Sequence, residues 1–249
     1  MTKKRTAGLL LAILVVAGCG KSVDPRAESF ARLPDWRGVW IEERGFHNGI
    51  SGIPDFFGKT RPFLDPEGPW TDSGRERLAP LLASFGTRKA QGWGYPMMML
   101  SPAPLQFLVT PDETLIVNIY QEVRHIYTDG REHPSEQDRW ATTWGDSIGH
   151  WEGDTLVIDT LAVREPSKFF QAGPPFSEQA RYSERLRLTA PGRIEGQITV
   201  EDPQTLTKSW TYKIAYLRTP NIDRLVQDTF DNDRSEVENG AFIIAPAKP

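Results

Sequence analysis

Short strand-like segments separated by turn residues dominate the chain from residue 105 onward, and this pattern constrains the fold more than any other feature. Most connections between them are short and carry Pro, Gly or Asp, which mark turns. Consecutive antiparallel strands tend to close on themselves, because closure removes exposed edges. The sequence therefore predicts an all-β, up-and-down, lipocalin-like barrel, with a two-sheet β-sandwich as the alternative. The predicted strands cover Leu105–Thr110, Thr114–Tyr120, Val123–Thr128, two strands within Ser147–Thr160, Ser177–Thr189, Arg193–Glu201, Lys208–Leu217 and Asp223–Phe230.

One hairpin can be placed residue by residue, in the stretch SIGHWEGDTLVIDT, Ser147–Thr160. A type II′ turn at Gly153-Asp154 sets Trp151 opposite Leu156. In this register Trp151, Leu156 and Ile158 share one face, whereas a turn one residue earlier would scatter them. Trp151 is therefore interpreted as a core residue, and a role toward a ligand is the alternative.

The first twenty residues are typical of an export signal. Basic residues precede an apolar run from about Leu9 to Val16, which is short for a membrane span. The sequence VAGC, which ends at Cys19, resembles a bacterial lipobox. The resemblance implies cleavage before Cys19 and lipid attachment to its sulfur, and an ordinary signal peptide is the alternative. Because Gly20 stands where an Asp would retain a Gram-negative lipoprotein in the inner membrane, we expect the periplasmic face of the outer membrane.

Cysteine content, charge and missing motifs argue against several kinds of bond, partner and site. Cys19 is the only cysteine, so the exported fold has no disulfide. Removal of the leader's three basic residues takes the net charge from −4 to −7, which argues against a nucleic-acid partner. We expect membrane contact through the lipid anchor only. No two of the four histidines stand at i, i+2 or i, i+4, so the sequence predicts no metal site. The sequence also contains no nucleophile elbow and no dinucleotide-binding loop. We therefore expect no cofactor.

The predicted domain organisation is simple. A signal peptide covers residues 1–18, a tether covers 19–34, and a single β-rich domain covers 35–249. Inside that domain we expect a strand, flap and helix over 35–104, the antiparallel meander over 105–233, and a tail over 234–249. The flap is the long aromatic-rich stretch Arg44–Trp70. The one short helix follows it, capped by Asp72 or Ser73 and ended by Gly86.

Two neighbouring segments supply the first candidate site residues. If Gln121-Glu122 is the turn between them, Tyr120, Asn118, His125 and Tyr127 share one face, which either is solvent-side or lines a ligand cavity. The other face is apolar except for Arg124. Its guanidinium needs a carboxylate, either on a ligand or on the protein. The protein candidates are Glu178, Glu184 and Asp159.

A second group lies in the stretch YTDGREHP, Tyr127–Pro134. Pro134 holds the preceding His133 in an extended conformation, which would aim its ring consistently. We interpret His133 as a candidate general acid or base, with Asp129 and Arg131 as its charged neighbours. The alternative is an ordinary turn at Asp129-Gly130.

Four segments carry a family resemblance: RHIYTDGREHP, SIGHWEGDTLVIDT, SEQARYSERLRL and EDPQTLTKSWT, in this order. Together they resemble a family of uncharacterised secreted bacterial proteins, over roughly residues 36–233. The resemblance implies no particular reaction and no catalytic residues. Members of that family often have a histidine where Phe176 stands in this chain, so a role that needs that histidine is not expected here.

The sequence does not specify a reaction. We interpret the chain as an outer-membrane lipoprotein whose barrel cavity binds a small, mostly apolar or aromatic molecule, because the aromatic residues and the flap suit an apolar concave site. One alternative is a cofactor-free isomerase, lyase or hydrolase that acts on such a molecule, with His133, Asp129 and either Arg124 or Arg131 at the barrel mouth. The other is an envelope assembly protein without a small ligand. The oligomeric state cannot be inferred from the sequence.

Overall fold

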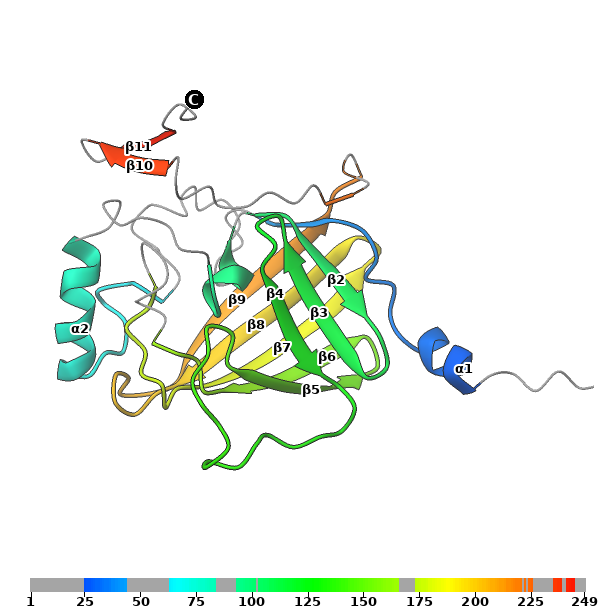
Figure 1. Ribbon diagram of the computed structural model, residues 1–249, viewed down its shortest axis with the longest axis horizontal. Coiled ribbons are helices and arrows are strands. Elements are labelled where there is room, and N and C mark those ends of the chain that lie inside the picture. The colour runs from blue at the N-terminus through cyan, green and yellow to red at the C-terminus, as the bar shows by residue number, and fades with distance from the viewer. Residues whose placement is uncertain are drawn as a thin grey trace, which may run out of the picture.

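A closed barrel of nine strands forms the body of the protein (Figure 1). The computed structural model describes residues 25–43, 63–83, 93–101, 103–165, 173–220, 222, 224–225, 235–238 and 241–244. The predicted all-β, lipocalin-like barrel is confirmed, and the strands do not split into a sandwich. The barrel strands are β1 (Trp40–Glu42), β2 (Leu105–Val109), β3 (Glu113–Asn118), β4 (Val123–Tyr127), β5 (Asp146–Glu152), β6 (Thr155–Leu161), β7 (Arg181–Ala190), β8 (Arg193–Glu201) and β9 (Trp210–Arg218).

Each barrel strand pairs with the next along the chain, and β9 pairs back onto β1. All these pairs are antiparallel except β4–β5, which is parallel and rests on the single pair Tyr127↔Ile148. The long loop 128–145 causes this exception, because it returns the chain to the starting end of β4 before β5 begins. The predicted up-and-down order therefore holds around the barrel apart from this one join.

The hairpin predicted at Gly153-Asp154 is confirmed in its register. Trp151 pairs with Leu156, and Gly149 pairs with Ile158. Gly153 has a φ of 59°, whereas Asp154 keeps a negative φ, which is the pattern of a type II′ turn. Leu156 and Ile158 are fully buried and Trp151 is partly buried against the same core.

The predicted register of β3 and β4 is wrong. The observed partners are Ile116↔Arg124 and Leu115↔His125, a shift by an odd number of residues from the expected pairing. The cause is a longer turn: the side-chain Oδ1 of Asn118 accepts hydrogen bonds from the backbone N–H groups of Tyr120 and Glu122. Asn118 thereby ends β3 two residues earlier than predicted. An odd shift exchanges the faces of a strand, so Arg124 and Asn118 share the inner face and His125 lies outside.

The two ends of the barrel differ. The hairpin end carries the turns at Thr110–Asp112, Gly153-Asp154 and Pro191-Gly192, together with α1 (Pro25–Ala31). The capped end carries α2 (Asp72–Ala83) and the connection between β8 and β9. α1 and α2 lie on opposite sides of the barrel (Figure 1). The predicted tether therefore contains a helix.

The predicted short helix is α2, but its cap is neither Asp72 nor Ser73. The Thr71 hydroxyl accepts the backbone N–H of Gly74, the usual N-cap hydrogen bond. The predicted end at Gly86 lies outside the described residues, as does most of the predicted flap. The described end of that flap, from Phe63 to Trp70, packs aromatic rings over the capped end: Phe63 contacts Tyr212, and both Phe63 and Trp70 contact Trp210.

Part of the chain fills the barrel from the capped end. This plug covers residues 93–101 and includes the 3₁₀ helix η1 (Met97–Leu100), all of whose side chains are buried. Its depth is fixed by the hydroxyl of Tyr216, which donates a hydrogen bond to the backbone carbonyl of Met99. The three consecutive methionines are therefore core packing, which suits their flexible side chains.

Outside the barrel, β10 (Ser235–Glu238) and β11 (Ala241–Ile244) form a two-stranded antiparallel sheet, in the region predicted as a tail. The predicted strand Asp223–Phe230 lies mostly outside the described residues. Of the helices the structure describes, none combines the length and hydrophobicity needed to cross a membrane.

Candidate functional site

Arg124 lies in the barrel interior and is fully buried. Its guanidinium donates two hydrogen bonds to the carboxylate of Glu184 on β7, at 3.1 and 2.5 Å. It also donates to the hydroxyls of Ser147 and Thr160, at 3.1 and 2.9 Å. Burial is the largest influence and lowers the pKa of Arg124, but the charge and hydrogen bonds of Glu184, together with the nearby Tyr95 and Tyr216, outweigh it, so the pKa is raised. Of the three proposed protein partners, Glu184 is the one found. The Arg124 guanidinium therefore binds a carboxylate of the protein itself and not one on a ligand.

An aromatic side chain of the plug completes this buried group. Tyr95 lies with its ring 4.0 Å from the Arg124 guanidinium carbon and edge-on to Tyr182 at 5.0 Å. Burial, with the nearby charge of Glu184, raises the pKa of Tyr95 well above its usual value. Burial likewise raises the pKa of Tyr182. Both phenols therefore stay neutral, and the interior presents polar groups at its centre within aromatic walls.

The other residues of the predicted polar face do not line the interior together. His125 and Tyr127 point outward from β4, and the His125 ring pairs with Glu113 at 2.6 Å on the surface. Asn118 is buried but serves the β3–β4 turn, where its amide also donates to Glu122. Glu122 in turn accepts the backbone N–H groups of Trp93 and Gly94, and so holds the start of the plug. Tyr120 lies in the turn itself and packs against the core.

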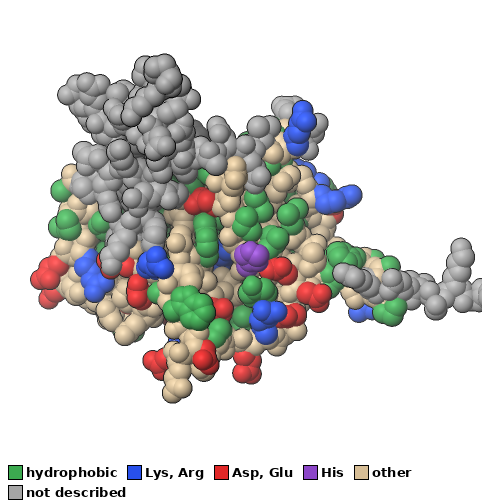
Figure 2. Space-filling model, in the orientation of Figure 1, with side chains coloured by type: hydrophobic (Ala, Val, Ile, Leu, Met, Phe, Trp, Pro, Cys, Tyr) green, Lys and Arg blue, Asp and Glu red, His purple; other side chains and the backbone are tan. Residues whose placement is uncertain are grey.

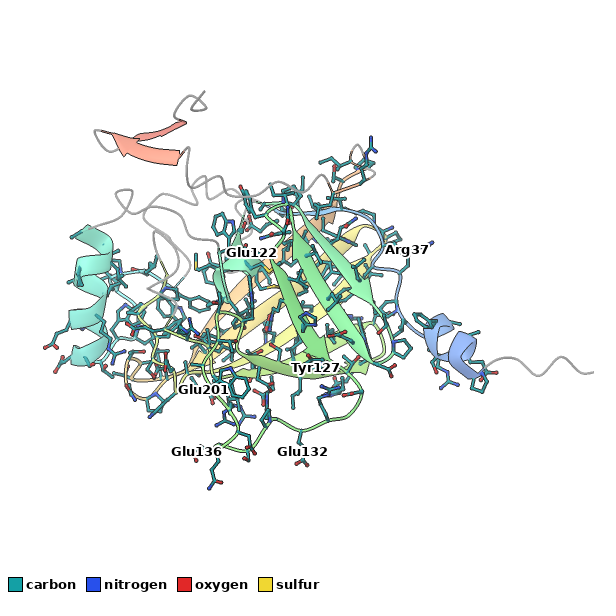
Figure 3. The ribbon with its side chains drawn as sticks, in the orientation of Figure 1. Arg37, Glu122, Tyr127, Glu132, Glu136 and Glu201 are labelled. Carbon is teal, nitrogen blue, oxygen red and sulfur yellow. The ribbon has the colours of Figure 1, made fainter. Side chains whose placement is uncertain are left out.

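Asp129 and Arg131 form a surface pair on the 128–145 loop. Their side chains are joined at 2.6 Å, and the Arg131 guanidinium covers the Tyr127 ring at 3.9 Å. The Arg131 hydrogen bond lowers the pKa of Asp129. Figure 3 shows Glu132 and Glu136 of the same loop projecting away from the strands. The charges of this loop are thus paired with each other or exposed to solvent.

His133 lies against the outer wall of the barrel rather than at its mouth. Its Nδ1 is 2.5 Å from Asp146 at the start of β5, and its Nε2 is 3.7 Å from Asp159 on β6. Asp159 is itself held by the guanidinium of Arg181. The structure therefore places His133 between two carboxylates, Asp146 and Asp159, instead of beside Asp129. A carboxylate on Nδ1 fixes the ring as a general base requires, but the other nitrogen is covered and faces Asp159.

A polar cavity of about 560 Å³ lies near this histidine, between the 128–145 loop and the wall. Leu161, one of its lining residues, pairs directly with Asp146, the partner of His133. Charged and amide side chains line the rim and small apolar side chains line the floor. The lining residues are Glu136, Arg139, Ala141, Leu161, Ala162, Glu178, Gln179 and Ala180.

A second cavity, of about 230 Å³, lies at the hairpin end, where α1 meets the barrel mouth. Phe30, Leu33 and Pro34 form one side of it, and Phe107 and Val109 of β2 form the other. Trp36 lines it as well. Its ring packs edge-on against Phe107 and Trp151, each at 5.1 Å. The Trp36 indole N–H is buried and has no hydrogen-bond partner among the described residues.

A charged pair, Asp35 and Arg37, stands at the rim of this hairpin-end cavity. The Arg37 guanidinium donates two hydrogen bonds to the Asp35 carboxylate, at 2.7 and 3.1 Å. These bonds lower the pKa of Asp35 from 3.8 to about 2. The guanidinium of Arg218 lies 3.9 Å from the same carboxylate, so these three ionised side chains carry one excess positive charge. Figure 3 shows Arg37 at the end that carries α1, far from Glu201 at the capped end.

Sequence reasoning missed the two features that define the interior and its mouth, the plug and Trp36. Glu184 was recognised only as one of three possible partners for Arg124. A stronger signal exists: in RYSERLRL the residues Tyr182, Glu184 and Leu186 alternate onto one face. When one strand carries an acidic residue on its inward face and another strand carries a basic residue on its inward face, the two together indicate an internal ion pair. No comparable signal marks Trp36.

Within the described ranges, no group of three or more His, Cys, Asp or Glu side chains could hold a metal ion. Cys19, the predicted lipid attachment site, lies outside the described residues. The barrel fold is compatible with binding a small molecule. Comparison with protein-family models and with curated proteins finds no match to this chain.

Proposed function

We propose that the protein is an envelope lipoprotein that binds a small, mostly apolar molecule at the hairpin-end mouth of its barrel. The observation that carries this proposal is the cavity of about 230 Å³ between α1 and β2. Its walls are mostly aromatic and aliphatic, with few polar groups, which is the usual character of a small-molecule site. Its volume lies below the roughly 300 Å³ at which drug-sized pockets begin, so it suits one or two rings or the end of a chain.

The aromatic packing around Trp36 supports the same function. Its ring lies edge-on against Phe107 and Trp151, each at 5.1 Å, so an apolar ligand in the cavity would meet a rigid aromatic wall. Anchoring at Cys19 would keep the protein on the periplasmic face of the outer membrane.

Two measurements test this proposal. Native mass spectrometry of protein purified from its own host is expected to show an added mass that organic extraction removes. An uncharged naphthylamine probe is expected to gain fluorescence on binding the purified protein, and Leu33→Asp should weaken that binding, since Leu33 lines the cavity on the α1 side. Absence of both a retained ligand and probe binding would refute the proposal.

A cofactor-free enzyme is the second candidate, and the His133 cluster favours it. Nδ1 of His133 is fixed by Asp146 beside the cavity of about 560 Å³, so a substrate that displaced Asp159 would meet an oriented imidazole. The test is incubation of a host envelope extract with the wild-type protein and with His133→Asn. If a compound is consumed by the wild type and not by the variant, the enzyme is supported. Equal consumption, or none, excludes His133 as its general base.

A further inference from the structure

We infer that the hairpin-end mouth faces the bilayer, and that its occupant is a single-chain amphiphile with a zwitterionic head, taken from the membrane. This inference rests on the proposed function, since it takes the lipid anchor and the apolar cavity as given. It adds the orientation of the barrel and the class of ligand.

The first argument is the length of the tether. Six peptide steps separate Cys19 from Pro25, the first residue of α1. A fully extended chain covers at most about 3.6 Å per residue, so the start of α1 stays within about 22 Å of a lipid on Cys19. α1 joins the barrel at the hairpin end and lines the cavity there through Phe30. The capped end lies further away by the length of the barrel, because a strand of about nine residues spans roughly 30 Å.

The second argument is the surface around the mouth. Phe30, on α1, is 44% exposed, and Leu108 and Leu217, on strands that reach this end, are 49% and 40% exposed. Scattered exposed hydrophobic residues are ordinary, and Trp140 on the 128–145 loop is 76% exposed, but these three lie on α1, β2 and β9, which all reach the hairpin end. Figure 2 shows hydrophobic side chains gathered where α1 meets the barrel. Such side chains can enter the headgroup boundary, which adds a second contact to the anchor.

The third argument is the chemistry of the cavity. Its walls of Phe30, Leu33, Phe107 and Val109 suit a hydrocarbon tail. Asp35 at the rim pairs with Arg37 and also lies 3.9 Å from the guanidinium of Arg218. The three side chains carry one excess positive charge, which suits the phosphate of a zwitterionic head. A ligand with these properties partitions into bilayers, and a mouth held against the bilayer gives it a route that avoids water.

The orientation can be measured in vesicles with the lipidated, full-length protein. Its one native thiol carries the lipid, so an introduced cysteine is the only site for a fluorophore. Ala190→Cys places the label on an exposed position at the hairpin end, and Lys208→Cys is the matched control at the capped end. Nitroxide phospholipids are expected to quench the label at 190 strongly and the label at 208 little. Equal quenching, or stronger quenching at 208, would overturn the orientation.

The ligand class is tested with a fluorescent lysophosphatidylcholine. Phe30→Asp places a carboxylate in the cavity wall without changing the barrel, and Ala27→Asp adds the same charge at an exposed position of α1 that does not line the cavity. Phe30→Asp should weaken binding about tenfold, because a ligand in the cavity would cover part of the Phe30 ring, which is 44% exposed, and an ionised carboxylate there opposes an apolar chain. Ala27→Asp should bind as the wild type does.

The two proposals fail in different ways. If the naphthylamine probe binds in solution but lysophosphatidylcholine does not, the amphiphile inference is wrong and the apolar site stands. Binding of lysophosphatidylcholine that Phe30→Asp leaves unchanged would place the ligand elsewhere and overturn the inference as well. If neither probe binds, the proposed function itself fails.

Discussion

Replacement of Arg124 by Met tests the buried ion pair, the most constrained group of the interior. Arg124 and Glu184 have no exposed side-chain surface. Met keeps much of the apolar stem and removes the guanidinium. Ser147 and Thr160 are not stranded by the change, because their hydroxyls already lie 2.8 Å apart and can pair with each other. The main effect of Arg124→Met is therefore an uncompensated carboxylate at Glu184.

The expected loss of stability follows from that carboxylate. Removal of one partner from a buried ion pair costs about 3–5 kcal/mol, because the remaining charge stays buried without its counter-charge. We expect Arg124→Met to lie in this range. The double variant Arg124→Met/Glu184→Leu should recover most of the loss, since replacement of both charges by apolar groups of similar volume is often close to neutral.

Urea unfolding followed by tryptophan fluorescence measures these differences. With a slope of about 3 kcal/mol per molar for a domain of this size, a loss of 4 kcal/mol shifts the midpoint down by about 1.3 M. The control is Arg185→Met, a surface arginine on the outer face of β7, which should shift the midpoint little. A midpoint for Arg124→Met within about 0.3 M of the wild type, or a double variant no more stable than the single one, would refute the reasoning about the stranded charge.

Three further predictions concern other parts of the chain. Trp151→Ala should lower the unfolding free energy by about 2–3 kcal/mol. This is less than the full cost of a buried indole, because Trp151 is only partly buried against Trp36. Urea unfolding measures the loss, and a loss under about 1 kcal/mol would mean that the indole serves a ligand. Arg37→Gln should return the pKa of Asp35 from about 2 toward its ordinary 3.8, as read by a carboxyl NMR titration. Because the folded pKa is depressed, the pair's small contribution is present above pH 3.8 and disappears as the pH falls through about 2; an unchanged titration would show that Arg37 is not its cause. Cys19→Ala should abolish lipid attachment, and a variant that still partitions into detergent like the wild type would refute the lipoprotein prediction.

The barrel could be predicted from the sequence because local signals agreed along most of the chain. Turn residues marked the strand ends, and the apolar alternation around Trp151 fixed one register. The β3–β4 register could not be read in this way, because Asn118 ends its strand through hydrogen bonds of its own side chain. The alternation of apolar and polar residues does not reveal the turn at Gln121, which has a φ of 62°. It does not reveal the parallel pairing of β4 with β5 at Tyr127 either.

The candidate site was less predictable, since its parts come together only through closure of the barrel. Arg124 on an inward face was a recognisable anomaly, and Glu184 is sixty residues further along the chain. His133 was singled out from its neighbours in sequence, yet its contacts are Asp146 and Asp159, which the 128–145 loop brings to it. The cavity beside Trp36 depends on α1, in a region that the sequence suggested was only a tether.

The single parallel contact between β4 and β5 divides the barrel into two units that can form separately. β5 to β9 are joined by short-range antiparallel pairing, whereas the ring closes only when β1 meets β9, about 175 residues away along the chain. Contacts between distant segments form late, because closing a long loop costs entropy before any contact is gained. We therefore expect the pairing of β1 with β9 to form last. The order of folding thus closes the hairpin-end mouth only after the individual hairpins are in place.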